Sequence, residues 1–512
     1  MLAVARTFAL LGVEARQVRV EVDVRAGLPA FTIVGLPDAA VRESRERVRA
    51  GLANAGFKFP QRRITVNLAP ANLPKAGPGF DLAIAAGVLA ASDQLAPDRL
   101  SALGLAGEVA LDGAIRAVPG ALAMAECARA CGLSRIAVPA ANAREAALAR
   151  LSEPSGGAPA PAVLGLGNLA ELRLLGSPSE PATTPAPELA VSPGAAGLPD
   201  LAEIKGQPFL RHALEVAAAG GHSLLMTGPP GAGKSMAARR LPSILPPLAV
   251  PEAVEVLRVA SACGASSTWA EARRRPFRHP HHTVSAAGLV GGGTPPRPGE
   301  VTMAHRGLLF LDELAEFSRD ALEALRQPLE DGEIVITRAR HSVRLPCRLM
   351  LVAAANPCPC GGRLAEEGCG CSPVAVRRYR DRLSGPLADR IDISVSIEQP
   401  SPEAMAAAPG EASAAVLARV QAARERQERR LGEGRCNAEM TAPELARHAC
   451  LAAQARLRLA QGQRQLALSG RGHDRVIRVA RTLADLDGVE AINARHLSEA
   501  LSLRRRGPDD GS

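Results

Sequence analysis

One short segment restricts what this chain can fold into more than any other. Residues 228–235 read Gly-Pro-Pro-Gly-Ala-Gly-Lys-Ser, which fits the pattern of a phosphate-binding loop. An apolar run over residues 223–227 predicts a buried strand before the loop, and residues 236–240 predict a helix after it. Backbone N–H groups of such a loop face phosphate oxygens at the start of a helix. The sequence therefore predicts a nucleotide site on a parallel α/β sheet.

The whole loop supplies the candidate nucleotide-binding residues, which are Gly228, Pro229, Pro230, Gly231, Ala232, Gly233, Lys234 and Ser235. Lys234 is expected to reach the β- and γ-phosphates, and Ser235 to offer its hydroxyl oxygen to Mg²⁺. ATP and Mg²⁺ are therefore the expected cofactors. The alternative is a chance glycine-rich turn, and the strand and helix patterns on either side argue against it.

Two later apolar runs also end in polar residues. Residues 307–311 precede Asp312 and Glu313, and residues 349–355 precede Asn356. We expect Asp312 to hold Mg²⁺ directly or through water, and Glu313 to orient and polarise the attacking water. Asn356 is expected to sense the γ-phosphate and to help place that water. The alternatives are a solvated acidic turn after the first strand and an ordinary turn asparagine after the second.

Composition limits the partners and the compartment. A chain of 512 residues exceeds what one hydrophobic core organises. The net charge of +9 favours a polyanionic partner, above all nucleic acid, while an aromatic content of 2% argues against stacking of bases on aromatic side chains. We therefore expect contacts mainly to phosphates. Since no apolar run approaches the roughly 18–20 residues that cross a bilayer, we expect a cytoplasmic protein without membrane contact.

The pattern of apolar and breaker residues divides the chain. The predicted parts are an α+β domain at 1–175, a linker at 176–199, a parallel α/β core at 200–398, a helical domain at 399–505 and a tail at 506–512. Within the first part, period-two alternation predicts a strand at 17–24, and further strands are expected at 31–35 and 64–68. Helices are expected at 38–55 and 81–91. The fold class is therefore α/β multidomain.

The order of the motifs resembles a known family, the magnesium-chelatase-like AAA+ ATPases of the YifB/ComM type. The motifs lie at residues 228–235, 298–307, 311–314, 325–332, 356–361 and 383–392. The resemblance covers nearly the whole chain and implies an AAA+ P-loop core with a helical lid. It also implies a homo-hexameric ring that hydrolyses ATP. The implied function is a branch-migration helicase that helps to integrate incoming DNA during natural transformation.

The resemblance also assigns candidate roles to arginines. Arg390 would be an arginine finger that reaches the γ-phosphate bound by the neighbouring subunit, and the alternative is a surface pair with Asp389. Arg471 would be the second sensor, with Arg475 as the runner-up. Arg338 falls on an expected hairpin at 332–345, where related helicases grip the DNA backbone. The alternative for Arg338 is a solvated hairpin tip.

The family resemblance also implies a role for a histidine-rich stretch. Residues 279–293 begin His-Pro-His-His-Thr and would form an insertion loop that faces the pore of the ring. Three histidines could bind a metal ion, but the proline and the tight spacing fit a loop better. No metal site is therefore expected there.

The N-terminal domain resembles the fold of Lon proteases, the ribosomal S5 domain 2-like fold, through the stretch at 74–82. In Lon proteases the nucleophilic serine would stand at Gly79 and the catalytic lysine near Ala123. A Ser–Lys dyad needs a hydroxyl and an amine, and the glycine and alanine at these two positions supply neither. We therefore expect no peptidase activity, and a domain kept as a platform for DNA binding or ring assembly.

Four cysteines form two Cys-x-Cys pairs after the third strand. They are Cys358, Cys360, Cys369 and Cys371. Four thiolates could hold a tetrahedral Zn²⁺, although the spacing is tighter than in the usual zinc knuckle. The alternative is four thiols on a glycine-rich loop.

Two other functions compete with the DNA motor. A chelatase motor subunit would drive metal insertion into a tetrapyrrole, and the additional N-terminal domain argues against it. A protease or protein unfoldase would need the missing dyad or an aromatic pore loop, and no aromatic residue lies in the segment 300–304. The ATPase assignment rests on the residues, whereas the DNA step rests mainly on the family.

Overall fold

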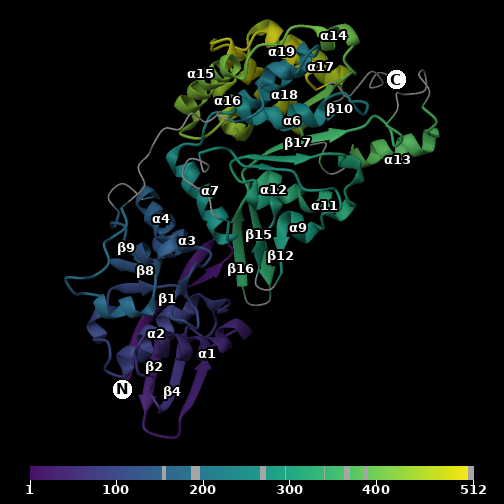
Figure 1. Cartoon of the computed structure of the whole chain (residues 1–512). Helices are drawn as coiled ribbons and strands as arrows, with labels where there is room; N and C mark the ends of the chain where they lie inside the picture. Colours follow the sequence, from purple (N-terminus) through teal and green to yellow (C-terminus); the bar gives the residue numbers. More distant parts are fainter. Residues whose placement is uncertain are drawn as a thin grey trace.

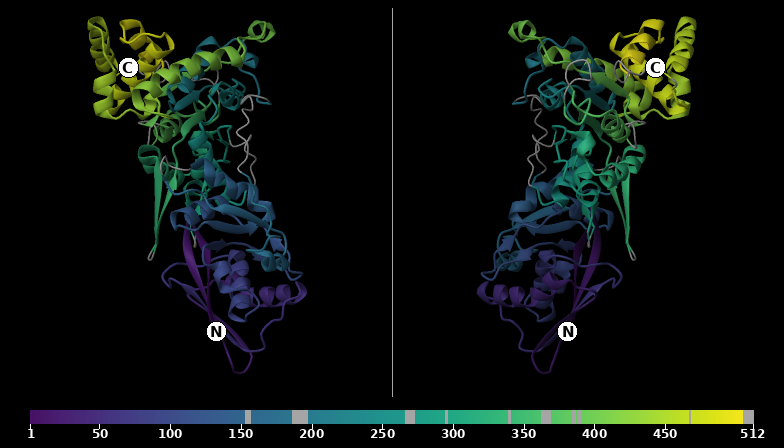
Figure 2. Two further views of the ribbon diagram at one scale, coloured as in Figure 1. Left: turned by 90° about the vertical axis from the view of Figure 1, so that its left-hand side faces the viewer. Right: turned by 90° about the vertical axis from the view of Figure 1, so that its right-hand side faces the viewer.

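The structure is a computed structural model with three tiers. It describes residues 1–152, 157–185, 197–265, 273–293, 296–338, 341–361, 369–383, 387, 390–466 and 468–504. Figure 1 shows the N-terminal domain at one end, the α/β core in the middle and the C-terminal helices at the other end. The two side views in Figure 2 show the same order, so the molecule is elongated.

A mixed seven-stranded sheet with the order β3-β4-β2-β1-β5-β8-β9 organises the N-terminal domain. Its strands are β1 (Leu2–Leu11), β2 (Glu14–Arg25), β3 (Ala30–Val34), β4 (Arg63–Ala69), β5 (Leu103–Leu105), β8 (Arg135–Pro139) and β9 (Ala162–Leu166), and a small hairpin adds β6 (Glu108–Val109) and β7 (Ile115–Arg116). Antiparallel pairing joins β1 to β2 and β2 to β4, whereas the remaining neighbours are parallel. The alternation in β2 buries Val18, Val20 and Val22, as the period-two pattern predicted.

Helices pack against this sheet. They are α1 (Ala39–Asn54), α2 (Asp81–Ala91), α3 (Ala121–Ala130) and α4 (Ala143–Ala147). Every residue of α2 is buried, which agrees with the helix expected at 81–91. Its first residue, Asp81, is held by Arg47 Nε at 2.6 Å from Asp81 Oδ2, so this buried charge is paired. The observed mixture of strands and helices matches the expected α+β class.

The expected linker at 176–199 was wrong for its first part. Residues 176–185 lie against the edge of the N-terminal sheet, where Thr184 N donates to Val163 O at 2.9 Å. Glu180 Oε1 also lies 2.8 Å from Arg135 Nη1 on β8. Composition alone suggested a free segment, but backbone pairing to β9 fixes it. Residues 186–196 lie outside the described part of the chain.

A five-stranded parallel sheet with the order β11-β14-β17-β10-β18 forms the core. Its strands are β10 (Leu224–Thr227), β11 (Phe277–Arg278), β14 (Leu308–Leu311), β17 (Met350–Ala355) and β18 (Ile393–Ser396). The three central strands are short apolar runs buried on both faces, because helices cover both sides of a parallel sheet. The surrounding helices are α5 (Pro208–Gly220), α6 (Lys234–Arg240), α7 (Val250–Ala262), α9 (Ala286–Val290), α10 (Glu300–Met303), α11 (Arg319–Ala324) and α12 (Arg326–Asp331).

A long hairpin leaves this core. It consists of β15 (Glu333–Arg338) and β16 (His341–Pro346), paired antiparallel, which confirms the hairpin expected ahead of the third strand. Figure 2 shows it projecting from the core along the N-terminal domain. At its base, Val13 from the β1–β2 turn joins Val343 and Leu345 in one buried apolar cluster. A second, two-residue pair is formed by β12 (Gly291–Gly292) and β13 (Arg297–Pro298).

Helix α7 joins the core to the N-terminal domain. Val254 and Leu257 of α7 are buried in the same apolar cluster as residues of α3. Gly120 N donates to Ser261 O at 3.0 Å, and Arg258 Nε lies 2.7 Å from Glu126 Oε2. The two domains therefore share apolar, backbone and ionic contacts through one helix.

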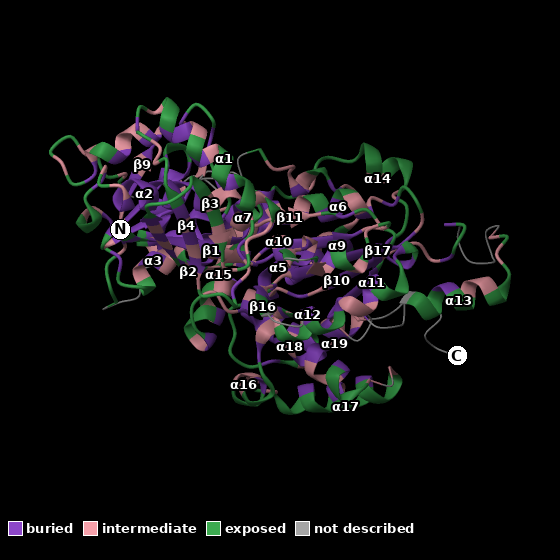
Figure 3. Ribbon diagram, turned by 90° about the horizontal axis from the view of Figure 1, so that it is seen from below, coloured by how far each residue is buried: buried purple, intermediate pink, exposed green. Residues whose placement is uncertain are grey.

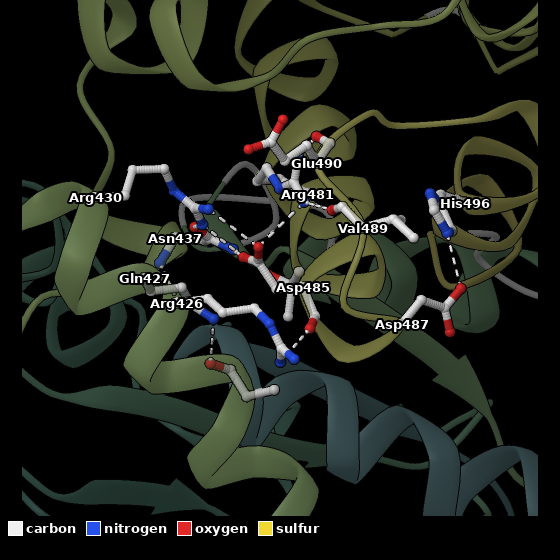
Figure 4. A network of polar contacts seen from close by, with 12 residues as sticks. Arg426, Gln427, Arg430, Asn437, Arg481, Asp485, Asp487, Val489, Glu490 and His496 are labelled. Atoms are coloured by element: carbon white, nitrogen blue, oxygen red, sulfur yellow. Dashed lines mark hydrogen bonds and ion pairs between the residues drawn. The ribbon is translucent and has the colours of Figure 1, made fainter.

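The C-terminal part is helical, as expected. After the protruding helix α13 (Pro373–Leu383) come α14 (Pro402–Ala406), α15 (Ser413–Leu431), α16 (Ala442–His448), α17 (Ala453–Gln465), α18 (Gly470–Leu486) and α19 (Ala494–Ser502). Buried Asp485 binds Arg430 at 2.6 Å, Asn437 at 2.8 Å and Arg481 at 3.1 Å, and Figure 4 shows these side chains converging on it. Among the described helices, none has the length and apolar character to cross a membrane.

Candidate functional site

Three neighbouring strands of the core sheet end at one edge. In the register, Thr227 of β10 lies opposite Ala355 of β17, and Leu311 of β14 lies opposite Ala353. The residues that follow these strands therefore share the carboxyl edge of the sheet, where ligands of open α/β sheets bind. The phosphate-binding loop, Asp312 and Asn356 all follow one of these three strands.

Lys234 lies at the centre of this edge. Its Nζ donates to Gly228 O at 2.5 Å, to Pro229 O at 2.9 Å and to Asn356 Oδ1 at 3.1 Å. Burial lowers the pKa of Lys234, while the charges of Asp312 and Glu313 oppose this shift. The helix that follows the loop is α6. It begins at Lys234 rather than at the predicted Met236, because Gly233 caps it with φ +88°, a left-handed conformation that suits glycine.

Ser235 and Asp312 meet at the same edge. Ser235 Oγ donates to Asp312 Oδ2 at 2.6 Å, which brings a hydroxyl and a carboxylate oxygen together from the loop and from β14. Mg²⁺ prefers oxygen ligands of these two kinds, so the residues present fit the ion. The sequence placed both residues at the metal, and the structure brings them into direct contact.

Glu313 has a backbone conformation that is uncommon outside glycine. Its φ is +52°, its N–H donates to Asp312 Oδ1 at 3.0 Å, and its carboxylate is exposed. Left-handed backbone at a non-glycine residue costs free energy and often occurs at active sites. The Glu313 carboxylate reaches a histidine, since its Oε2 lies 3.4 Å from Nδ1 of His282.

Residues 279–293 were predicted as a loop that faces the pore of a ring, and the sequence did not predict that His279 and His282 lie at this edge. His282 reaches Glu313, and the ring of His279 lies 4.8 Å from that of Phe310 on β14. Burial lowers the pKa of His279. Both histidines follow β11, the strand next to β14, so they reach the same carboxyl edge. The signal was a polar cluster after a strand, but a strand of only two residues gives no apolar run to recognise.

The candidate arginines gather at the other edge of the sheet. Arg390 precedes β18, where its Nη2 lies 2.6 Å from Oε1 of Glu330 and its Nε donates to Arg326 O at 3.2 Å. Arg471, in the first turn of α18, places Nη1 2.9 Å from the same Oε1. The structure thus brings together two arginines that are far apart in the sequence. Asp389, the alternative partner of Arg390, lies outside the described residues.

Arg390 and the phosphate-binding loop lie at opposite ends of the core sheet. Leu224 lies opposite Ile393 and Thr227 opposite Ser396, so Arg390 and Gly228 are at opposite ends of paired strands. Four residues of strand span about 13 Å. The amino edge instead carries a cavity of about 540 Å³ that Arg390 and Glu330 help to line.

The runner-up Arg475 has a different environment. It is buried, and its Nε lies 3.1 Å from Asp392 Oδ1. Burial alone would raise the pKa of Asp392, but the hydrogen bond from His222 and the charges of Arg475 and Arg478 lower it overall. Arg475 therefore neutralises a buried carboxylate, whereas the side chain of Arg471 is 64% exposed. The geometry favours Arg471 over Arg475 as a group that meets a ligand from outside.

The remaining candidates lie at three places. Cys358, Cys360, Cys369 and Cys371 form one cluster beside Asn356. Arg338 ends β15, and its side chain lies outside the described part of the structure. Gly79 lies in a short turn before α2, and Ala123 is buried in α3.

Comparisons with known proteins place the chain in a family. The family "Magnesium chelatase, subunit ChlI" matches residues 200–405, "Subunit ChlI of Mg-chelatase" matches 20–142, and "Magnesium chelatase, subunit ChlI C-terminal" matches 410–504. The uncharacterized protein YifB of Escherichia coli K12 is 42% identical over 505 residues, covering 98% of this chain and 97% of that protein. The competence protein ComM of Haemophilus influenzae shows the same identity and the same coverage.

Another relative aligns with a smaller part of this chain. The magnesium-chelatase 38 kDa subunit of Cereibacter sphaeroides is 29% identical over 217 residues, which cover 38% of this chain and 58% of that protein. The family supports an ATPase motor that uses ATP and Mg²⁺. This chain belongs to the YifB/ComM family of magnesium-chelatase-like AAA+ ATPases.

Proposed function

We propose that the chain is the subunit of a hexameric, ATP-driven DNA motor that promotes branch migration during the integration of incoming DNA. The observation that carries the proposal is the division of the site between two edges of one sheet. Lys234, Asp312 and Asn356 lie at the carboxyl edge, and Arg390 lies at the amino edge. A ring in which each amino edge faces the next carboxyl edge completes every site.

The residues of the carboxyl edge have separable roles in this proposal. Lys234 exchanges its contacts with loop carbonyls for phosphate oxygens, and its low exposure keeps that charge out of water. Ser235 and Asp312 hold Mg²⁺, which neutralises developing phosphate charge when it is bound. Glu313 orients the attacking water and accepts its proton. Asn356, hydrogen-bonded to Lys234, places the γ-phosphate.

The residues of the amino edge act on the neighbouring subunit. In the ring, Arg390 leaves Glu330 and donates to the γ-phosphate held by the adjacent copy, where it stabilises charge in the transition state. Arg471 binds the same phosphates from the helical domain. Because both arginines respond to the neighbour's nucleotide, hydrolysis in one subunit changes the contacts of the next.

The DNA step rests on charge, shape and relatives. The net charge of +9 favours a polyanion, and the hairpin of β15 and β16 projects from the core, which supports a role for it in the pore of the proposed ring. Arg338 at the end of β15 would bind the phosphate backbone. A relative that matches almost the full length of the chain is named a competence protein.

A chelatase motor subunit is the second candidate. All three matching families are described by a chelatase subunit, which favours it. The 38 kDa chelatase subunit, however, shares only 217 aligned residues with this chain, whereas YifB and ComM share 505. We propose that the N-terminal domain has a Lon-like fold without a catalytic dyad. If the chain is a DNA motor, this domain is a platform for DNA binding or ring assembly.

One set of reactions tests the proposal. ATP hydrolysis by the purified protein is measured without DNA and with single-stranded DNA, duplex DNA and a mobile four-way junction. Movement of a labelled junction is followed in the same tubes. Stimulation by DNA together with junction movement is the expected result. A rate of ATP hydrolysis that no DNA substrate changes would contradict the DNA-motor proposal and would favour the chelatase motor subunit instead.

A further inference from the structure

Four cysteine sulfur atoms converge immediately beyond the candidate sensor residue Asn356. The Sγ atoms of Cys358, Cys360, Cys369 and Cys371 all lie within 4.8 Å of one another. Cys358 lies 3.4 Å from Cys360 and 3.4 Å from Cys369, and Cys360 lies 3.5 Å from Cys369. Two separate stretches of chain therefore bring their sulfurs to one point.

These distances have the size of a metal tetrahedron. Zn–S bonds of about 2.3 Å give sulfur–sulfur edges of about 3.8 Å, close to those observed. A disulfide would need about 2.05 Å between two sulfurs, and it would pair the cysteines rather than gather all four. Thiolates are soft ligands, and four of them in a tetrahedron favour zinc over magnesium or calcium. We propose that Cys358, Cys360, Cys369 and Cys371 bind one Zn²⁺ that holds the nucleotide site in its working shape.

The cluster touches the phosphate-binding loop. Gly361 N donates to Cys358 O at 3.0 Å and folds the chain back immediately after the first pair of cysteines. A Cβ on Gly361 would lie 2.8 Å from Cγ of Pro230, so the cysteine loop packs directly on residues that surround phosphate. Asn356 stands only two positions before Cys358. Fixing the sulfurs therefore restricts the backbone that carries Asn356.

The chain leaving the cluster returns to the same site. Helix α13 begins two residues after Cys371, and Figure 3 shows it extending from the core with mostly exposed residues. Its buried Tyr379 lies beside the backbone of Asn356, and burial raises the pKa of Tyr379 to about 12. Arg382 Nη1 donates to Ala315 O at 3.3 Å, in the turn that follows Glu313. A metal at the start of α13 thus fixes both contacts.

The zinc site is therefore a positioning element. It ties the backbone of Asn356, the phosphate-binding loop and the turn after Glu313 to one rigid point, so that Asn356 meets Lys234. The role proposed for zinc is to hold the backbone, and phosphoryl transfer is assigned to Lys234, Ser235, Asp312 and Glu313. The effect on hydrolysis rests on the proposed function, whereas the binding of zinc does not.

The first experiment measures metal alone. Zinc is quantified by mass spectrometry in the purified full-length protein, in Cys369→Ser and in Cys450→Ser, whose cysteine is exposed on the helical domain. We expect one zinc per chain in the wild type and in Cys450→Ser, and loss of zinc in Cys369→Ser. Co²⁺ in place of zinc should give the visible absorption of a tetrahedral thiolate site. Wild-type protein without zinc, and with four titratable thiols at these positions, would overturn the proposal.

The second experiment separates positioning from folding. The wild type is stripped of zinc by a chelator, returned to excess Mg²⁺, and assayed before and after zinc is restored. Displacing a catalytic group by about 1 Å costs roughly 100-fold in rate, so we expect kcat to fall by about 10- to 100-fold while ATP binding is unchanged. Restored zinc should restore kcat. Equal kcat with and without zinc would overturn the positioning role, and absence of ATPase activity in zinc-loaded wild type would instead reject the proposed function.

Discussion

Arg390 and Arg471 donate to the same oxygen atom of Glu330. Arg390 Nη2 lies 2.6 Å and Arg471 Nη1 lies 2.9 Å from Glu330 Oε1. Glu330 therefore ties two arginines from distant parts of the sequence, Arg390 and Arg471, to one point at the amino edge of the sheet.

Mixing two inactive variants tests whether Arg390 acts on a neighbour. Lys234→Ala should lose nucleotide binding, and Arg390→Ala should bind ATP but lose roughly 1,000-fold or more in kcat, as arginine fingers do. In a mixed ring, an Arg390→Ala subunit keeps its own Lys234 and receives Arg390 from a Lys234→Ala neighbour. We therefore expect ATPase activity to reappear when the two variants are coexpressed and purified together.

The control for this mixture is the double variant. Lys234→Ala/Arg390→Ala mixed with either single variant should regain no activity, because no junction between subunits in these mixtures contains both Lys234 and Arg390. A mixture of the single variants that stays as inactive as its parts would place Arg390 within its own site.

Glu313→Gln should trap the nucleotide. The amide keeps the size of the side chain but cannot accept a proton, and general bases of this kind contribute about 100- to 10,000-fold to rate. We expect kcat to fall within that range while equilibrium binding of ATP is kept. Glu316→Gln, three residues later in the same exposed turn, is the matched control and should hydrolyse ATP as the wild type does. Normal turnover by Glu313→Gln would exclude its role in activating water.

The sequence predicted the carboxyl edge better than the amino edge, for a physical reason. Lys234, Asp312 and Asn356 each follow an apolar run, and parallel strands bring such ends to one edge whatever the details of packing. The pairing of Arg471 with Glu330 depends on where α18 packs against the core, which no local pattern encodes. Arg471 could therefore be chosen only by resemblance.

Two other features of the structure differ from the sequence-based prediction for physical reasons. The position of His282 beside Glu313 was not predicted, because β11 has two residues and offers no apolar run. The stretch at 176–185 was taken for linker because it is rich in proline and serine. Its backbone pairing with β9 through Val163 is a tertiary contact that composition does not reveal.

Gly12→Ala should destabilise the base of the hairpin formed by β15 and β16. Gly12 has φ +63°, and an added Cβ would overlap Val343 and lie 2.7 Å from Leu345 Cδ2. Left-handed strain costs about 1–2 kcal/mol, and overpacking adds about 1–3 kcal/mol. Gly132→Ala is the control, because it shares a positive φ of +71° and has no neighbour within 4 Å. Thermal unfolding should show the larger loss for Gly12→Ala, with faster hydrogen exchange in β16. Equal losses would mean that the turn does not support the hairpin.

The link between α7 and the core should weaken in acid. Burial raises the pKa of Glu255, but hydrogen bonds from His305 and Arg306 outweigh it and lower the pKa from 4.5 to about 2. A depressed carboxyl pKa stabilises the fold above the unfolded value, and this stabilisation is lost as the pH falls from about 4.5 toward about 2.

Hydrogen exchange in α7 measures this effect. At pH 7, Glu255→Gln should exchange faster than the wild type, because it removes the carboxylate charge that binds His305 and the Nε of Arg306. The difference between the two proteins, compared at equal pH, should narrow below about pH 4.5. Glu428→Gln, on the exposed face of α15, should match the wild type throughout. A difference that is constant from pH 7 to pH 3 would show that the charge of Glu255 does not stabilise α7.

Arg338→Ala tests the proposed contact between the hairpin and DNA. Removing one phosphate contact should leave hydrolysis without DNA unchanged, weaken the stimulation by DNA, and reduce the salt dependence of DNA binding by about one unit of slope. Arg344→Ala is the matched control, since Arg344 lies on the partner strand of the same hairpin and pairs with Glu333 at 3.1 Å. Stimulation by DNA and its salt slope are measured for both variants. If Arg338→Ala responds to DNA as Arg344→Ala and the wild type do, the hairpin tip is solvated and the DNA contact lies elsewhere in the ring.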